Sequence, residues 1–272
     1  MARKLDTTSA AIRAVRLMEA VAAAERPLSL TALVDAVGLP KPTVHRIVGE
    51  LAADGLLARE PVGKRFTVGP RLARLGLGAV INPGVRAERH AILQGLVARI
   101  GETCNLTMLD GGEVVYLDRV ETAWPLRMNL QPGSRVPTHC SASGKLLLAF
   151  LPKSRRTRLL SALPTPRFTE NTIDDPKRLA AELDRIRAQG YATDDEEYLA
   201  GVACVAVPVR VARGRVVAAV AVHAPTSRMP LERGLGFLPM LEEAAAALAA
   251  TLEPGRDAAS APAAAPRRRR AA

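Results

Sequence analysis

Aromatic residues are scarce in this chain: Phe, Trp and Tyr make up 3% of its 272 residues, whereas hydrophobic residues of all kinds make up 48%. Aliphatic side chains must therefore supply nearly all of the core, and there are enough of them for two domains. No apolar run approaches the ~18 residues that span a bilayer. The opening residues, MARKLDTTSAAIRAV, contain no apolar segment typical of a signal peptide. We therefore expect a soluble, cytoplasmic protein without a membrane partner.

Cysteine is also rare. The three cysteines, Cys104, Cys140 and Cys204, are far apart in the sequence and form no CxxC pair. Such spacing disfavours both a disulfide framework and a zinc site. We expect reduced thiols, no metal and no cofactor.

Acidic residues are outnumbered by basic ones. The chain carries 38 Lys and Arg against 27 Asp and Glu, a net charge of +11. The excess is densest at the N-terminus, where residues 1–80 hold twelve basic and seven acidic side chains. This balance favours a polyanionic partner such as nucleic acid. A genome generally rich in Arg would give the same bias without that partner.

The N-terminal residues have the pattern of a helix-turn-helix. A helix over about 8–24 has apolar residues at helical spacing, and a second helix begins after Ser29, a good N-cap. Gly38 suits the left-handed position that ends a helix, Pro40 cannot continue that helix, and Pro42 fits the first turn of a third. The apolar stripe predicted for this third helix is Val44, Ile47, Val48 and Leu51.

The third helix is the candidate recognition element. The second helix of a helix-turn-helix enters the major groove of DNA through its N-terminal residues. A predicted hairpin follows, with strands near 56–60 and 65–68, and its position is that of a wing that meets phosphates. The alternative is an ordinary solvated helix face. The residues predicted to contact double-stranded DNA are Lys41, Thr43, His45 and Arg46 on the helix and Arg59, Lys64 and Arg65 on the wing.

The rest of the chain alternates strands and helices, which predicts an α+β fold with a mainly antiparallel sheet. A helical connector over 71–80 and a break at 82–84 precede it. Glycines at 111–112 and a turn at 212–214 mark two hairpins. The expected strands are 105–110, 114–120, 126–130, 202–211 and 216–223, and the expected helices are 84–100, 141–151, 175–190 and 231–252.

Several stretches together resemble the IclR family of bacterial transcription regulators. The segment LSLTALVDAVGLPKPTVHRIVGELAADGLL is similar to the helix-turn-helix of that family. VVYLDRVE, HCSASGKLLLAFLP and GYATDDEEYLAGVACVAVPV are similar to its C-terminal motifs, of which the last two are the more specific. The resemblance covers roughly residues 8–252.

This resemblance implies a winged helix-turn-helix domain over 1–70, a linker helix over 71–82 and a GAF-like effector-binding domain over 83–252. The Ala-, Pro- and Arg-rich tail at 253–272 is expected to be disordered. The resemblance also implies homodimers, often paired into tetramers, on partly palindromic operators. Operator affinity would be controlled by a small organic acid or aromatic effector, in repressors and activators alike.

The effector site can be placed through the same resemblance. A helix opening at Ser141 to Gly144 would direct backbone N–H groups at a carboxylate. Two final-strand positions that often hold serine in such family members hold Ala221 and His223 here, which implies a different effector; His223 suits a carboxylate or a phenolic oxygen. The residues predicted to contact the effector are Ala142, Ser143, Asp194, Val202, Cys204, Ala221 and His223. Cys204 as a core residue and His223 as a structural one are the alternatives, and Leu106, Met108, Met128 and Leu130 belong either to the pocket wall or to the core.

An enzymatic role has little support. No serine lies three residues before Lys145, as Ser-x-x-Lys chemistry requires, and the carboxylates at 194–197 lack clustered histidines for a metal. A Cys204 nucleophile with His139 or His223 as its base stays open. The other alternative is an architectural DNA-binding protein without a ligand, which the basic tail favours and the weakly charged C-terminal part opposes. The sequence thus predicts a sequence-specific regulator of transcription rather than an enzyme.

Overall fold

The computed structural model describes residues 9–24, 26–61, 63–124 and 130–252. The chain forms two compact units that divide between Asn82 and Pro83. Within the described residues, no helix is both long enough and apolar enough to cross a membrane.

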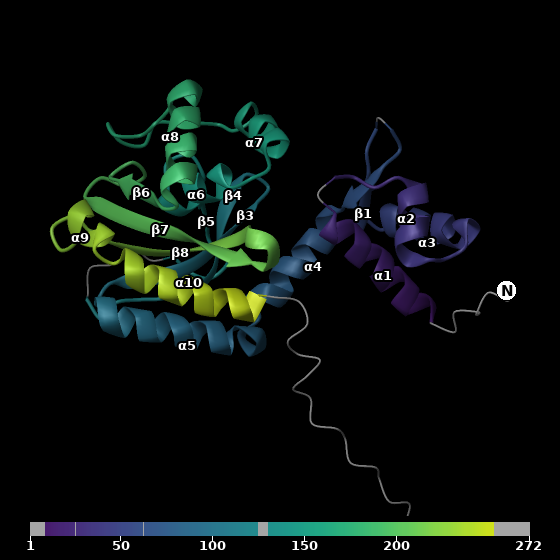
Figure 1. The fold of residues 1–272 in the computed structure, drawn as a ribbon, viewed down its shortest axis with the longest axis horizontal. Helices are drawn as coiled ribbons and strands as arrows, with labels where there is room; N and C mark the ends of the chain where they lie inside the picture. Colours follow the sequence, from purple (N-terminus) through teal and green to yellow (C-terminus); the bar gives the residue numbers. More distant parts are fainter. Residues whose placement is uncertain (1–8, 25, 62, 125–129, 253–272) are drawn as a thin grey trace, which may run out of the picture. The chain divides into compact units, whose positions relative to one another are not determined.

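The first unit contains α1 (Ala10–Ala23), α2 (Leu30–Val37), α3 (Lys41–Ala53), β1 (Leu57–Arg59), β2 (Phe66–Val68) and α4 (Pro70–Ile81) (Figure 1). The predicted helix-turn-helix is confirmed. Ser29 caps α2, since its Oγ accepts the N–H of Ala32 at 3.2 Å. Gly38 ends α2 in the left-handed region at φ +68°, which a Cβ would disfavour.

An aliphatic core holds α3 against its neighbours. The predicted stripe of α3 is buried, and it packs with Leu17, Leu33, Leu57 and Phe66 from the surrounding elements. The wing is confirmed as an antiparallel pair of β1 and β2. Leu28 extends this pair as an isolated bridge, because Leu28 and Phe66 exchange both backbone hydrogen bonds at 2.8 and 2.9 Å. The wing is therefore tied to the segment that leads into α2.

The second unit is built on one six-stranded antiparallel sheet, in the order β5-β4-β3-β8-β7-β6. The strands are β3 (Thr103–Asp110), β4 (Glu113–Val120), β5 (Arg135–Pro137), β6 (Ala192–Asp195), β7 (Val202–Val211) and β8 (Arg215–Pro225). Both predicted hairpins, β3-β4 and β7-β8, are confirmed. The strand expected at 126–130 falls almost wholly outside the described residues, as does the tail at 253–272.

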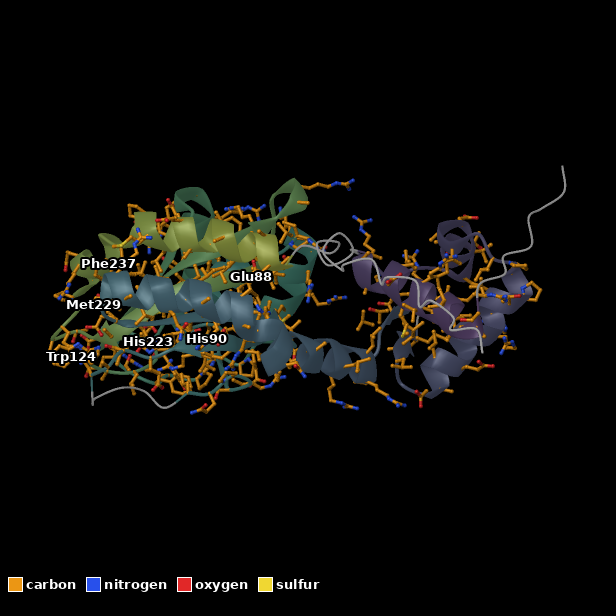
Figure 2. All side chains as sticks on the ribbon, turned by 90° about the horizontal axis from the view of Figure 1, so that it is seen from below. Glu88, His90, Trp124, His223, Met229 and Phe237 are labelled. Carbon is orange, nitrogen blue, oxygen red and sulfur yellow. The ribbon has the colours of Figure 1, made fainter. Side chains whose placement is uncertain are left out.

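Helices cover both faces of this sheet (Figure 1). On one face lie α5 (Pro83–Ile100) and α10 (Leu238–Leu252), side by side (Figures 1 and 2). On the other face lie α6 (Ala142–Ala149) and α8 (Pro176–Gln189), with α7 (Lys153–Leu160) nearby. Strand alternation assigns each side chain to one face or the other. Ala206 and Ala221, which are paired across β7 and β8, pack in the cluster beneath α6.

Two helices differ from the sequence-based expectations. The single helix expected over 231–252 is wrong: α9 (Leu231–Leu235) ends at Gly236, and α10 starts at Leu238. Pro239 lacks an N–H to bond to the preceding turn, which favours this break. The exposed helix α7 was not predicted, because its sequence KSRRTRLL has no apolar stripe and none of its residues is buried.

Prediction from the packing of α6. Every residue of α6 is buried, and a Cβ on Gly144 would collide with the backbone of Thr138. Gly144→Ala should therefore lower the free energy of unfolding by about 1–3 kcal/mol. Gly95→Ala is the matched control, because Gly95 lies inside α5 with nothing within 4 Å of its added Cβ. It should stabilise by roughly 0.5–1 kcal/mol. Urea unfolding of both variants measures the contrast, and a neutral Gly144→Ala would contradict the packing.

Candidate functional sites

The outer face of α3 presents the predicted DNA-contacting side chains. Lys41, His45 and Arg46 are exposed, and Thr43 is half-buried. The inner face is locked by the buried stripe, so these side chains keep a fixed register on a rigid helix. The arrangement suits the reading of base edges by a helix inserted in the major groove.

A groove of about 520 Å³ lies between α3, the start of α2 and the wing. It brings together three of the predicted residues, His45, Arg59 and Lys64. Arg65 is exposed on the wing outside the groove lining, and the Arg59 guanidinium lies 5.9 Å from the centre of the Phe66 ring. The sequence analysis missed Ser29 and Thr31, which also line this groove. Their place at the start of α2 gives them backbone N–H groups of the kind that bind phosphate.

One ion pair lies on the recognition face itself. Arg46 Nη1 donates to Glu50 Oε1 at 2.7 Å, one helical turn away, and both side chains are more than 60% exposed. An exposed pair of this kind is weak, typically below ~1 kcal/mol. The Arg46 guanidinium is thus held over the outer face of α3, and its separation from Glu50 costs little free energy.

A cavity of about 30 Å³ lies in the second unit between the start of α6, the sheet and the loop after β6. Six of the seven residues predicted for the effector line it: Ala142, Ser143, Asp194, Val202, Cys204 and His223. The seventh, Ala221, is fully buried in the cluster beneath α6 and is absent from the lining. Its short side chain packs against the helix and does not reach the cavity.

The residues suggested for an apolar wall lie elsewhere. Leu106 is fully buried and pairs with Val220, whose side chain alternates to the α5 face. Leu130 packs against the cluster of Val114, Tyr116 and Val136. That cluster supplies the apolar wall instead, since all three of its members line the cavity. Met128 falls outside the described residues, and Met108 is not in the lining.

His223 and Asn105 form the polar part of the sheet wall. Asn105 Nδ2 lies 3.1 Å from His223 Nδ1, and both residues are more than 90% buried. Burial, with a smaller effect of the nearby Arg119 cation, lowers the pKa of His223 to about 3. The imidazole is therefore neutral at physiological pH. Arg119 itself is buried and has its guanidinium 6.0 Å from the centre of the Tyr116 ring.

Asp194 is a buried carboxylate in β6, just before the loop that follows this strand. Its Oδ1 accepts the backbone N–H groups of Glu197 at 2.8 Å and Tyr198 at 3.3 Å, which shapes this loop. Burial, followed by repulsion from Glu197, raises the pKa of Asp194 to about 7. The side chain thus changes charge near neutral pH, inside a cavity suited to a small ligand.

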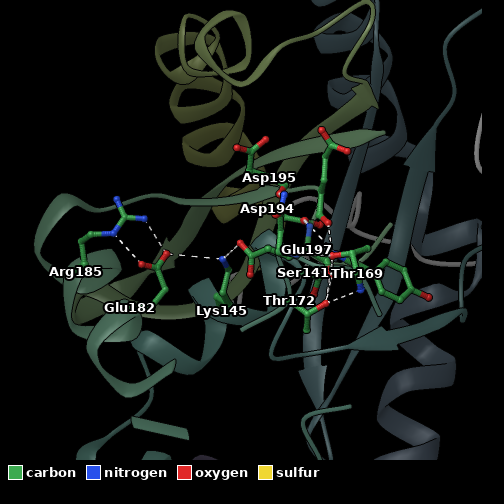
Figure 3. A network of polar contacts seen from close by, with 12 residues as sticks. Ser141, Lys145, Thr169, Thr172, Glu182, Arg185, Asp194, Asp195 and Glu197 are labelled. Carbon is green, nitrogen blue, oxygen red and sulfur yellow. Dashed lines mark hydrogen bonds and ion pairs between the residues drawn. The ribbon is translucent and has the colours of Figure 1, made fainter. Parts of the chain in front are cut away.

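A buried ion pair connects α6 to the same loop (Figure 3). The ammonium of Lys145, 1% exposed, donates to Glu197 and lies 3.7 Å from Glu182 on α8, which Arg185 also binds. Removal of one partner from such a pair leaves a buried charge unpaired, which typically destabilises by about 3–5 kcal/mol. The pair fixes the position of the loop that carries Tyr198 and Leu199 into the cavity wall.

A second segment secures this loop from outside. Thr169 Oγ1 donates to the carbonyl of Glu196 at 2.6 Å, and Thr172 Oγ1 donates to that of Glu197 at 2.7 Å (Figure 3). Phe168 lies edge-on to the Tyr198 ring, with their centres 5.3 Å apart. The cavity wall is therefore held by hydrogen bonds to its backbone and by an aromatic contact to its side chain.

The geometry argues against the nucleophile hypothesis. Burial raises the pKa of the Cys204 thiol, which disfavours the thiolate that such chemistry needs. His223 uses Nδ1 for Asn105, and His139 places Nε2 2.9 Å from the carbonyl of Pro166. Among the described residues, no three His, Cys, Asp or Glu side chains come together as a metal site would require.

The cavity residues missed by the sequence analysis share one cause. Asn105 begins a predicted strand, but its neighbour on β8, Ala221, lies more than a hundred residues away in the chain. Tyr116 lies opposite Thr107 in the β3-β4 hairpin and reaches the cavity by alternation with Val114. Alternation along β3 and β4 gave a signal for the face of each residue but not for its partners across the sheet.

Comparison with known proteins identifies the family. A model of the IclR helix-turn-helix domain matches residues 10–61, and one of the bacterial transcriptional regulator IclR C-terminal domain matches residues 78–250. The fold is thus that of a DNA-binding transcriptional regulator with a separate C-terminal domain. The chain belongs to the IclR family.

Individual relatives agree with this assignment. The probable transcriptional regulator SauR of Cupriavidus necator is 50% identical over 239 residues, which cover 88% of this chain and 95% of that protein. The crystal structure of the Thermotoga maritima IclR has a TM-score of 0.60 at 28% identity and covers 89% of this chain and 98% of its own. An IclR homologue from Microbacterium hydrocarbonoxydans, complexed with 4-hydroxybenzoate, has a TM-score of 0.57 at 27% identity. The match covers 90% of this chain and 99% of that homologue.

Prediction from the buried carboxylate. The pKa of Asp194 is about 7 in the folded chain against an ordinary 3.8. The folded state therefore binds the proton more tightly, and this contribution to stability is fully present below about pH 4 and lost as pH rises through about 7. Asp194→Asn keeps the Oδ1 acceptor without the charge. Its stability relative to the wild type should rise by roughly 2–4 kcal/mol across this interval.

Urea unfolding at about pH 5 and about pH 8 measures this difference. The control is Asp195→Asn, the exposed neighbour on the same strand. Its effect should be small, because this side chain is exposed. A pH-independent effect of Asp194→Asn would contradict the raised pKa.

Proposed function

We propose that this protein is a sequence-specific, dimeric DNA-binding regulator whose operator affinity is set by a small-molecule effector. The observation that carries the proposal is that one chain contains both a candidate DNA-binding surface and a candidate ligand cavity. A basic recognition face is present in the first unit, and a small, mainly apolar cavity with a few polar groups lies at the start of α6 in the second. The cytoplasmic location expected from the sequence follows from the DNA partner and belongs to this proposal.

The DNA-binding surface consists of α3, the wing and the start of α2. Lys41, Thr43, His45 and Arg46 read base edges or adjacent phosphates from the major groove. Arg59, Lys64 and Arg65 meet the backbone and position the helix without reading sequence. The groove lined by Ser29, His45 and Lys64 gives one phosphate both backbone N–H groups and a cation.

A second copy of the chain is the partner that the exposed apolar surface favours. None of the residues of α4 is buried, although the helix carries the apolar side chains of Leu75, Leu77 and Val80. On α1, Ile12 and Val15 are 48% and 41% exposed. Apolar helix surface of this extent indicates a contact. A two-fold dimer would bring two recognition helices to half-sites one helical turn apart, on a partly palindromic operator.

Effector binding regulates this dimer through the segment 70–100. A ligand in the cavity contacts α6, β6 and the loop after β6, and a change in their packing reaches α5 through the sheet. A coupling of roughly 1–3 kcal/mol gives about 5- to 150-fold control of operator affinity. A small organic acid fits a site at the start of a helix. An aromatic effector is supported by the 4-hydroxybenzoate complex of the Microbacterium relative.

Test of the proposed function. The purified full chain is incubated with a random pool of duplex DNA at near-physiological salt, and the bound fraction is amplified and sequenced. An enriched inverted repeat is expected, because a symmetric dimer reads two half-sites. Strong, salt-sensitive binding without enrichment would favour the architectural alternative instead.

Prediction for the recognition helix. Arg46→Ala should weaken binding to the selected operator by about 1–3 kcal/mol and relax specificity at one base position, because Arg reads guanine in a bidentate manner. Lys64→Ala is the comparison. It should weaken binding to all sequences alike and reduce the salt slope by about 1, as a phosphate contact does. Fluorescence anisotropy on operator and scrambled duplexes separates the two. Uniform weakening by Arg46→Ala would make it a phosphate contact.

A further inference from the structure

The cavity contains two buried polar atoms without a hydrogen-bond partner. Within the described residues these are Asn105 Oδ1 and His223 Nε2, and both of their side chains line the cavity. A buried polar atom left without a partner typically destabilises by about 1–3 kcal/mol. Two such atoms on adjacent side chains of one cavity wall indicate a site whose occupant completes them. His223 is labelled in Figure 2.

The chemistry that these two atoms require can be worked out. In the orientation shown, Asn105 Nδ2 donates to His223 Nδ1 at 3.1 Å, so the neutral ring carries its proton on Nε2. The pair then offers one donor, Nε2–H, and one acceptor, Oδ1. If the amide is turned over, Oδ1 accepts from Nδ1–H, and the free atoms become the Nδ2 donor and the Nε2 acceptor. Either way, one donor and one acceptor remain.

A hydroxyl group satisfies both atoms, because it donates and accepts at once. A carboxylate only accepts, so it would leave the acceptor of the pair unpaired and would repel it. The carboxylate therefore belongs elsewhere in the cavity. This reasoning separates the polar pair on the sheet from the anion site at the helix.

The start of α6 supplies that anion site. Ser141 Oγ donates to the carbonyl of Pro137 at 2.6 Å and makes no capping bond to the helix. The first N–H groups of α6, at Ala142 and Ser143, therefore have no side-chain cap, and both residues line the cavity. Uncapped N–H groups at a helix start bind anions. The cavity is small, about 30 Å³, and partly open, so the ligand is small.

We propose that the effector is a small hydroxy acid, with its carboxylate at the start of α6 and its hydroxyl between Asn105 and His223. This inference rests on the proposed function, since it names the effector class of the same cavity. It assigns to Asn105 and His223 the discrimination between a hydroxylated acid and its deoxy counterpart. A site built to hydrogen-bond a hydroxyl rejects the analogue that lacks it, because the buried partners are then left unpaired.

The test compares acids that differ by one hydroxyl. Isothermal titration calorimetry on the full chain measures glycolate against acetate, lactate against propionate, and 3-hydroxypropionate against propionate. At least one hydroxy acid should bind roughly 10- to 100-fold more tightly than its counterpart. Equal affinity within all three pairs, or binding of none of them, would overturn the inference. The selection of operator DNA uses the same protein without any effector, so a failure here leaves the DNA-binding result intact.

Variants of the polar pair separate recognition from folding. Asn105→Leu and His223→Leu should each reduce the hydroxy-to-deoxy affinity ratio to about 1–3, while binding of the deoxy acid persists. Thr107→Val is the matched control. Thr107 lies two residues after Asn105 on β3 and is not part of the cavity lining. Its hydroxyl donates to the Ala219 carbonyl at 3.4 Å. The control should keep the wild-type ratio. An unchanged ratio in both test variants, with the deoxy acid still bound, would remove the pair from recognition.

Discussion

The buried ammonium of Lys145 is the constraint on which the second unit depends. All eight residues of α6 are buried, so a lysine in its first turns can reach no water and must find a carboxylate. Glu197 provides it, with Glu182 close by. Because Glu197 lies directly after β6, the same bond fixes the loop that closes the cavity. One desolvated charge thus sets the position of α6, of α8 and of the cavity wall together.

Asp194 lies in the same buried environment but has different partners from Glu197. Lys145 has its ion pair with Glu197, and Asp194 is left with backbone N–H groups as its partners. Two carboxylates near one ammonium cannot both be ionised cheaply at neutral pH. Burial raises the pKa of both carboxyl groups, and the pKa of Asp194, which lacks the salt bridge, reaches about 7. The burial of α6 therefore accounts for both the Lys145–Glu197 ion pair and the titratable Asp194 beside the cavity.

Local features of the fold were predictable from the sequence. Ser29, Gly38 and Gly190 act at helix ends through their own chemistry, so cap and stop residues located α2 and α8 within a residue or two. The two hairpins followed from their turns. The family resemblance supplied six cavity residues, which single-sequence periodicity could not have provided. What lay beyond the sequence was the non-local β3-β8 register that joins Asn105 to His223.

The Arg46–Glu50 pair on α3 has a consequence for selectivity. A guanidinium that reaches DNA already paired with a carboxylate brings little net charge, so fewer counterions leave the duplex when it approaches an arbitrary sequence. Glu50 also repels phosphates. In the proposed mode of binding, a base pair that offers guanine acceptors to the arginine, or a cytosine amino group to the glutamate, offsets the small cost of separating the pair. If α3 contacts DNA as proposed, this pair lowers non-specific affinity and so favours specificity over raw affinity.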